Sequence, residues 1–287
     1  MNPAQPPSAS PSIPTPPAAR EVTVPPMTRN IHRVAFGLFL ACFVASVAVL
    51  LGGQTAVEKW HWVEQLLIVL AAITTVVNLG CRLSAQNATV VVVLIALFAT
   101  IAEMMDARSG VPFGPRTFTD ALGDKMLRSV PWPMPLLWLA AILNSRGLAR
   151  ILMRPYRKTT YYGFWLIGVT GLLTAAFAVT LEPFATAVKH YWLWQSPARV
   201  LAWHTAPWAN FLGWFATTIL ILGFTTPWFI HKHPLPPTMD LHPLFLWVLL
   251  SLYFATGCAT QRIWDAVVVT GVIAGVVIAF AVRGVRT

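Results

Sequence analysis

Eight apolar runs, each close to the length of a membrane-spanning helix, leave few folds open to this chain. A helix needs about 20 consecutive apolar residues to cross the hydrocarbon core of a bilayer. We therefore expect an all-α fold, a polytopic membrane bundle of seven to eight transmembrane helices. The runs lie at residues 34–53, 63–80, 88–105, 131–149, 162–181, 209–230, 243–260 and 264–282.

Composition excludes a soluble protein. Only 10% of the residues are charged, whereas soluble domains carry about a quarter. The formal net charge of +10 is best explained by basic residues that flank the spans and meet anionic lipid headgroups, rather than by binding to nucleic acid. The expected surroundings are therefore a lipid bilayer, with no nucleic acid as a partner.

Prolines bear on the number of spans and on the boundary between the N-terminal tail and the membrane domain. Pro131, Pro133 and Pro135 crowd the start of the fourth run, and proline is tolerated in the first turn of a helix but not deeper. That run is the weakest, so both seven and eight spans stay open. Residues 1–28 hold nine prolines, which predicts a disordered tail there and an integral membrane domain over residues 29–287.

Basic residues favour a cytoplasmic N-terminus, and we expect the inner membrane of a bacterial cell as the location. The main support is a basic cluster between the fourth and fifth runs: Arg146, Arg150, Arg154, Arg157 and Lys158. In this orientation the segments after the third and fifth runs share one side of the membrane. Both hold unusual polar residues, so they could form one site.

Three segments carry those polar residues. The first runs from Glu103 to the turn Gly110-Val-Pro-Phe-Gly114. The second begins with Glu182-Pro183 and reaches Trp192-Leu-Trp194, and the third, Asn210-Phe-Leu-Gly-Trp214, opens the sixth run. An ionisable group in a membrane span costs a few kcal/mol, so such a residue usually marks a functional site.

In this order and spacing, the three segments resemble the family of carotenoid-biosynthesis membrane proteins that includes the carotenoid 1,2-hydratases. The resemblance covers roughly residues 95–230. The chain departs from the family pattern at several positions. Asp106 stands where a glycine is usual, Arg116 and Phe118 stand where tyrosines are usual, and Ala178 replaces an aspartate.

The resemblance implies hydration of the terminal isoprenoid double bond of an acyclic carotenoid. An acid protonates the less substituted carbon, and water captures the tertiary cation. An apolar site keeps a carboxylic acid protonated because desolvation raises its pKa, and aromatic faces stabilise the cation. We expect no cofactor or metal, since the chain has no Gly-rich phosphate loop, HExxH or Asp-rich prenyl-diphosphate motif.

Candidate roles follow from the resemblance and this chemistry. Glu103 is the first candidate for the proton donor, and Glu182 is the second candidate or the group that orients water. Asp120 and Asn210 could hydrogen-bond the acid or the water. The candidate walls of the substrate channel are Phe113, Trp192, Trp194, Trp208 and Trp214.

Each candidate also has a purely structural explanation. Glu103 could be solvated at a helix end, and Glu182-Pro183 could simply end a helix. Asp120 could lie on a lipid-surface helix over residues 119–126. Asn210 could cap the sixth span, and tryptophans commonly anchor membrane interfaces.

The rival function is a non-catalytic one. The protein could bind a carotenoid or act as a scaffold for other carotenoid-pathway enzymes. A retinal-binding pump is excluded, because the last two apolar runs contain no lysine for a Schiff base. A transporter is disfavoured, because the spans are nearly uncharged in their middles.

Overall fold

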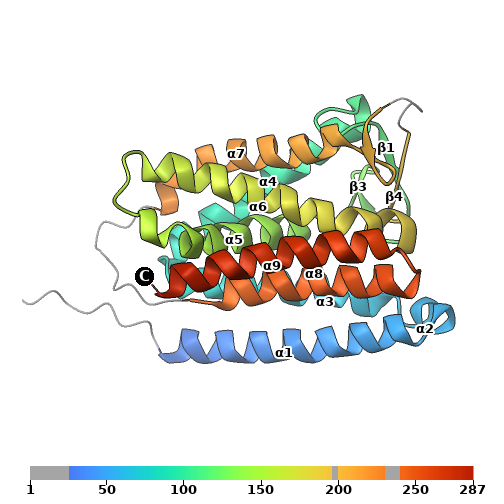
Figure 1. Ribbon diagram of the computed structural model, residues 1–287, viewed down its shortest axis with the longest axis horizontal. Helices are drawn as coiled ribbons and strands as arrows, with labels where there is room; N and C mark the ends of the chain where they lie inside the picture. The colour runs from blue at the N-terminus through green and yellow to red at the C-terminus, as the bar shows by residue number, and fades with distance from the viewer. Residues whose placement is uncertain (1–25, 196–199, 230–239, 287) are drawn as a thin grey trace, which may run out of the picture.

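The computed structural model describes residues 26–195, 200–229 and 240–286. Eight long helices run side by side in the described part of the chain, which confirms the all-α bundle (Figure 1). They are α1 (Pro26–Leu51), α3 (Trp62–Gly80), α4 (Ala85–Ser109), α5 (Met134–Leu152), α6 (Tyr162–Pro183), α7 (Trp208–Phe229), α8 (His242–Thr260) and α9 (Trp264–Arg286).

The bundle has two distinct ends. The strand end carries residues 110–133, 184–195 and 200–207, together with the short helix α2 (Gln54–Lys59). The terminal end holds the start of α1 and the end of α9 (Figure 1). Hydrogen bonds at the terminal end join segments that are distant in the sequence. The Cys81 thiol donates to the Thr28 carbonyl, and the Asn87 amide donates to the Trp228 carbonyl.

Helix α5 lies at the centre of the bundle and contacts α3, α4, α6, α8 and α9. Seven of the long helices are apolar enough to cross a membrane by length and composition, and α5 is the one left out. Its second half carries Asn144, Arg146 and Arg150, which lower its hydropathy. Because its neighbours shield it from lipid, α5 does not need the apolar surface that the other helices present.

The prolines at the start of α5 lie at positions where a helix tolerates proline. Pro133 precedes α5 and Pro135 sits in its first turn, where no helical N–H is lost. The predicted tail lies outside the described residues as far as residue 25. Pro26 already begins α1, so residues 26–28, which the sequence placed in the tail, are helical.

Three short antiparallel pairs form at the strand end. Strand β1 (Arg116–Phe118) pairs with β4 (Trp192–Trp194), so the segments after α4 and α6 meet as expected. The other pairs are β2 (Lys125–Met126) with β3 (Val130–Pro131), and β5 (Ala202–Trp203) with β6 (Ala206–Pro207). A π-helical turn, η2 (Phe184–Val188), continues α6, and a 3₁₀ turn, η1 (Arg154–Tyr156), follows α5 at the terminal end.

Candidate functional site

Helix α4 delivers two carboxylates to the interior of the strand end. Its buried face repeats every three or four residues and ends in Glu103 and Asp106, which are both almost fully buried. Gly110 closes the helix in the left-handed conformation. Oδ1 of Asp106 then accepts hydrogen bonds from the backbone N–H groups of Phe113 and Gly114, at 2.9 and 3.2 Å. The Pro-Phe-Gly turn is thereby fastened to the end of the helix.

Arg116 joins the two carboxylates. Its Nη2 lies 2.6 Å from Oε2 of Glu103, and its Nε lies 3.1 Å from Oδ2 of Asp106. The second oxygen of Glu103 accepts a 2.8 Å hydrogen bond from the indole N–H of Trp138, on the central helix α5. Both ion pairs are shielded from solvent, so each charge depends on its partner.

Strand geometry explains why Arg116 points inward. Alternate residues of a strand share a face, and in β1 the side chains of Arg116 and Phe118 are buried while Thr117 is exposed. Four rings surround the guanidinium, each with its centroid 5.0 to 5.2 Å from the guanidinium carbon: Phe113, Phe118, Trp192 and Trp194. The cation is thus held in an aromatic cage.

Helix α6 supplies the third carboxylate, Glu182, immediately before Pro183. Its Oε2 accepts hydrogen bonds from the indole N–H groups of Trp192 and Trp194, at 3.2 and 3.1 Å. Its Oε1 accepts a 2.7 Å hydrogen bond from the side-chain amide of Asn210 on α7. No Lys, Arg or His of the described segments forms an ion pair with this fully buried carboxyl group.

The β1–β4 pair brings the carboxyl groups into one cluster. Phe118 lies opposite Trp192, and Arg116 lies opposite Trp194. The indoles that bind Glu182 are therefore also walls of the cage around the guanidinium that binds Glu103. We call Glu103, Asp106, Arg116, Glu182 and Asn210 the carboxyl cluster.

Neighbouring carboxylates raise the pKa of the guanidinium in this cluster. Burial tends to lower the pKa of Arg116, but the negative charges of its ion-pair partners, Glu103 and then Asp106, act against burial, and the net effect is to raise it. Arg116 therefore stays a cation. Three carboxyl groups then face one positive charge.

Two glycines allow the turn to approach the helices closely. A Cβ on Gly213 of α7 would lie 2.6 Å from the Pro112 carbonyl oxygen. Gly114 has φ of +114°, and a Cβ there would lie 2.9 Å from Pro207. The glycines of both motifs are thus explained by packing of the turn against α7 and β6.

The structure brings most of the predicted site residues together. Glu103, Glu182 and Asn210 belong to the carboxyl cluster, and the rings that line it are Phe113, Trp192, Trp194 and Trp214. Asn210 does not cap α7, since that helix begins at Trp208 and the side chain of Asn210 reaches Glu182 instead.

Two predicted residues lie elsewhere. The side chain of Asp120 is 89% exposed and pairs with Lys125 at 3.0 Å. Residues 119–126 contain a bend, a turn and the strand β2, so they do not form the alternative lipid-surface helix. Trp208 is 47% exposed at the start of α7, which fits an interfacial position better than a wall of the cluster.

Sequence reasoning missed the partners of Glu103. Asp106 and Arg116 were noted only as departures from the family pattern, yet here they bind each other. The spacing of Glu103 and Asp106, three residues apart on one helix, could have signalled a shared face. Trp138 gave no signal of this kind, because its approach to Glu103 depends on the central position of α5.

Several polar atoms of the site have no partner among the described residues. They are Nη1 of Arg116, Oδ1 of Asn210 and Nε1 of Trp214. The indole of Trp214 stacks on Trp138 with ring centroids 3.9 Å apart. Buried polar atoms normally find a partner, so these three are available to a water molecule or a substrate.

Long apolar helices around a buried polar cluster define an integral membrane protein of the helical-bundle class. Its sequence shows the family to which it belongs. The chain belongs to the carotenoid biosynthesis protein family, whose pattern matches residues 63–278, and this confirms the resemblance found in the three segments.

Bisanhydrobacterioruberin hydratase of Haloarcula japonica is a distant relative, 25% identical over 142 residues. The match covers 48% of this chain and 46% of that protein, so the chain spans less than half the length of the relative. No solved structure matches the chain.

Proposed function

We propose that this protein hydrates the terminal isoprenoid double bond of an acyclic carotenoid by acid catalysis at the carboxyl cluster. Membership of the carotenoid biosynthesis family and the hydratase relative support the reaction class. The observation that carries the proposal is the environment of Glu182. It is a buried carboxyl group with aromatic rings beside it and without an ion-pair partner in the described segments.

The roles of the two glutamates reverse the order that the sequence suggested. Glu103 is neutralised by Arg116 and fixed by Trp138, so it is best suited to hold the guanidinium in place. Glu182 lacks a cationic contact and is the better candidate for the proton donor. Departure of its proton would create a carboxylate that three N–H groups already face.

Asn210 can serve both protonation states of Glu182. Its Nδ2 donates to the carboxylate as described, and after rotation of the amide its Oδ1 would accept the proton of the acid form. The unpartnered Oδ1 could also position the attacking water. Asn210 is therefore proposed to orient the acid and the water.

The reaction balances with these groups alone. Glu182 gives its proton to the less substituted carbon of the double bond, and the more substituted carbon becomes a tertiary cation. The rings of Trp192 and Trp194 stabilise this cation. Water then forms the new C–O bond, and its surplus proton returns to Glu182, which leaves a tertiary alcohol.

The lipophilic substrate needs a route along the membrane. An apolar groove of about 520 Å³ lies on the outward face of α7, lined by Phe215, Ala216, Ile219, Leu220, Gly223 and Phe224. It starts one residue after Trp214 and is therefore close to the cluster along α7. We propose that the polyene lies in this groove and that its end group enters the bundle at the strand end.

The groove can be tested without disturbing the fold. A Cβ on Gly223 would meet no atom within 4 Å, so Gly223→Leu should fill the groove and lower product yield by roughly tenfold. Gly271→Leu on α9, where a Cβ is equally free, is the matched control. Equal yields from the two variants would remove the groove from the proposal.

The location of the reaction follows from the charges. We propose that the terminal end faces the cytoplasm of a bacterial cell, because the arginines that follow α5 gather there. The reactive end of the substrate would then be in the outer half of the inner membrane. Other enzymes of the carotenoid pathway are the proposed partners.

The decisive experiment is co-expression with a pathway that produces lycopene, followed by mass analysis of the pigments. A gain of one water is expected with the natural chain. Glu182→Gln should lower that product by about 100-fold or more, whereas Glu58→Gln, an exposed acid on α2, should not. Loss of product with pigment still bound supports the enzyme. An unchanged pigment in the presence of well-inserted protein favours the non-catalytic carotenoid-binding alternative.

A further inference from the structure

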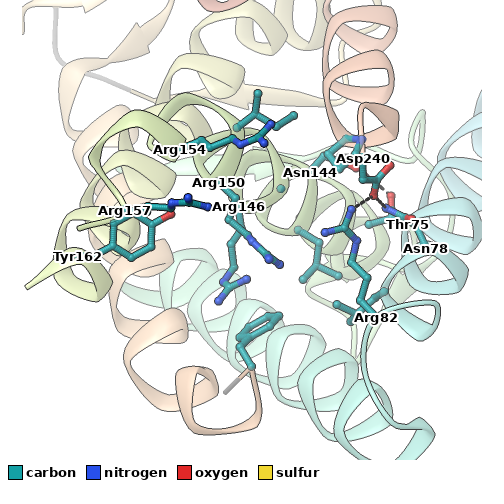
Figure 2. Close-up of a pocket in the computed structure, with 16 residues that line it drawn as sticks. Thr75, Asn78, Arg82, Asn144, Arg146, Arg150, Arg154, Arg157, Tyr162 and Asp240 are labelled. Atoms are coloured by element: carbon teal, nitrogen blue, oxygen red, sulfur yellow. Dashed lines mark hydrogen bonds and ion pairs between the residues drawn. The ribbon is translucent and has the colours of Figure 1, made fainter. Parts of the chain in front are cut away.

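The terminal end contains a second polar feature, which the proposed reaction does not use. A cavity of about 210 Å³ opens between α3, α5 and the ends of α7 and α8 (Figure 2). Five arginines line it, and we call the cavity the arginine pocket: Arg82, Arg146, Arg150, Arg154 and Arg157.

Among the described residues that line the arginine pocket, Asp240 is the one acid, and it is already engaged. Oδ2 of Asp240 lies 2.7 Å from Nη2 of Arg82 and accepts a hydrogen bond from the Asn78 amide (Figure 2). Oδ1 of Asp240 accepts a hydrogen bond from the backbone N–H of His242. Burial acts to raise the pKa of Asp240, but the contacts with His242, Arg82 and Asn78 outweigh it and hold the pKa well below its usual range. Asp240 therefore neutralises Arg82, and the other four arginines have no acid beside them in the part of the chain that the structure describes.

The remaining four arginines come from one short stretch at intervals of four, four and three residues. Two of them, Arg146 and Arg150, lie four residues apart on α5, where like charges repel each other. None of the four forms an ion pair with an acid in the described ranges. The sequence of residues 230–239, between α7 and α8, contains no Asp or Glu that could supply the missing charge.

Arg146 is the most enclosed member of this group. Its guanidinium carbon lies 3.6 Å from the ring centroid of Phe229, at the end of α7. Stacking fixes the plane of the guanidinium and leaves its N–H edge free for an acceptor. Figure 2 shows the side chains of Arg146 and Arg150 lying close together, with Arg154 and Arg157 nearby. Several guanidinium groups thus converge where no acid of the described segments balances their charge.

We propose that the arginine pocket binds the phosphate group of a phosphate-bearing anion. Guanidinium groups bind phosphate through paired N–H donors, and clusters of arginine are the usual sites for it. A basic pocket between membrane helices suits the headgroup of an anionic phospholipid, and a soluble phosphate or diphosphate offers the same chemistry. The site lies at the opposite end of the bundle from the carboxyl cluster and does not depend on the reaction there.

The test compares two pocket arginines with a neighbour outside the pocket. Arg146→Gln removes the enclosed guanidinium, and Arg157→Gln removes that of an exposed residue, where a substitution usually changes stability little. Lys158→Gln removes one positive charge from the same surface but does not line the pocket. Each variant of the full chain is purified in mild detergent and analysed by native mass spectrometry for retained phospholipid.

A second measurement covers the soluble source. Thermal unfolding is followed during titration with inorganic phosphate and with diphosphate at constant ionic strength, and again in phosphatidylcholine nanodiscs with and without phosphatidylglycerol. A ligand that binds the folded state raises the unfolding temperature with its concentration. Losing one charged phosphate contact should weaken the apparent affinity by about tenfold.

The outcomes separate the possibilities. Retained phospholipid, or stabilisation by phosphatidylglycerol, that is lost in the pocket variants but kept in Lys158→Gln assigns the site to a lipid headgroup. Saturable stabilisation by phosphate or diphosphate with the same pattern assigns it to a soluble anion. If Arg146→Gln does not fold, Arg157→Gln alone decides. No binding of either kind, or equal weakening by Lys158→Gln, overturns the proposal.

Discussion

The two ends of the bundle handle charge in opposite ways. At the strand end, one guanidinium binds two of three buried carboxyl groups, and aromatic rings surround the guanidinium. At the terminal end, five arginines line an open cavity, and one carboxylate, Asp240, pairs with one of them. The difference lies in where the balancing charge can come from.

An enclosed excess of carboxyl groups can be balanced by protons, because a proton needs no cavity. An excess of guanidinium groups cannot lose its charge at ordinary pH, since arginine stays protonated. It therefore needs an anion, and an anion needs space. The closed cluster at the strand end and the open pocket at the terminal end fit these two requirements.

The largest effect should follow from removing the cation of the strand end. Arg116→Met leaves Glu103 and Asp106 buried without their partner, which should destabilise the protein by about 3–5 kcal/mol. Unfolding in detergent micelles measures this. Adding Glu103→Gln and Asp106→Asn to the same chain removes the stranded charges and should restore most of the loss. Additive losses instead would show that the three side chains do not act as a unit.

At the terminal end, removal of the single acid should have a smaller effect. Asp240→Asn should cost about 1–3 kcal/mol, because Arg82 loses its partner. The pKa of Asp240 is lowered by folding, so its stabilisation is complete above the ordinary pKa of about 4 and is lost as pH falls below it. The unfolding temperatures of the two chains should therefore converge in acid. A constant gap down to pH 3 would contradict this origin.

Salt should distinguish the two ends. Raising ionic strength from about 0.1 to about 1 M shortens the Debye length from about 10 to about 3 Å. Binding of phosphate at the open arginine pocket should weaken by roughly tenfold, while hydration at the enclosed carboxyl cluster should change by less than about twofold. Affinity is followed by thermal shift and hydration by pigment mass. A parallel decline of both would mean that the cluster is as exposed to ions as the pocket is.

The smallest effect is expected at Asp120. Its exposed side chain lies outside the carboxyl cluster, so Asp120→Asn should keep product yield within about twofold. The co-expression assay measures it beside Glu182→Gln. A loss as large as that of Glu182→Gln would return Asp120 to the site and weaken the assignment made from the contacts.

Much of the fold could be predicted because a membrane helix can be recognised from the hydropathy of one contiguous segment. The runs of the sequence correspond to the eight long helices. The fourth run is the weakest in the sequence because of its prolines, and the structure places Pro133 before α5 and Pro135 in its first turn, where a helix tolerates them. Glu103 and Glu182 stood out for a local reason too, since carboxyl groups are rare in apolar segments. Asp120 looked equally unusual, but the residues around it do not indicate the path of the chain after Gly114, and so they do not indicate whether its side chain is buried or exposed.

The sequence by itself determined the membrane setting, the helices and the family, because composition, apolar run length and motif order are properties of contiguous segments. Only the tertiary structure decided which charges meet. Arg116 reaches Glu103 across 13 residues, Asn210 reaches Glu182 across 28, and Asn78 reaches Asp240 across 162. Such pairings depend on how helices and strands pack, and the free energy of a buried charge depends on the partner that packing supplies.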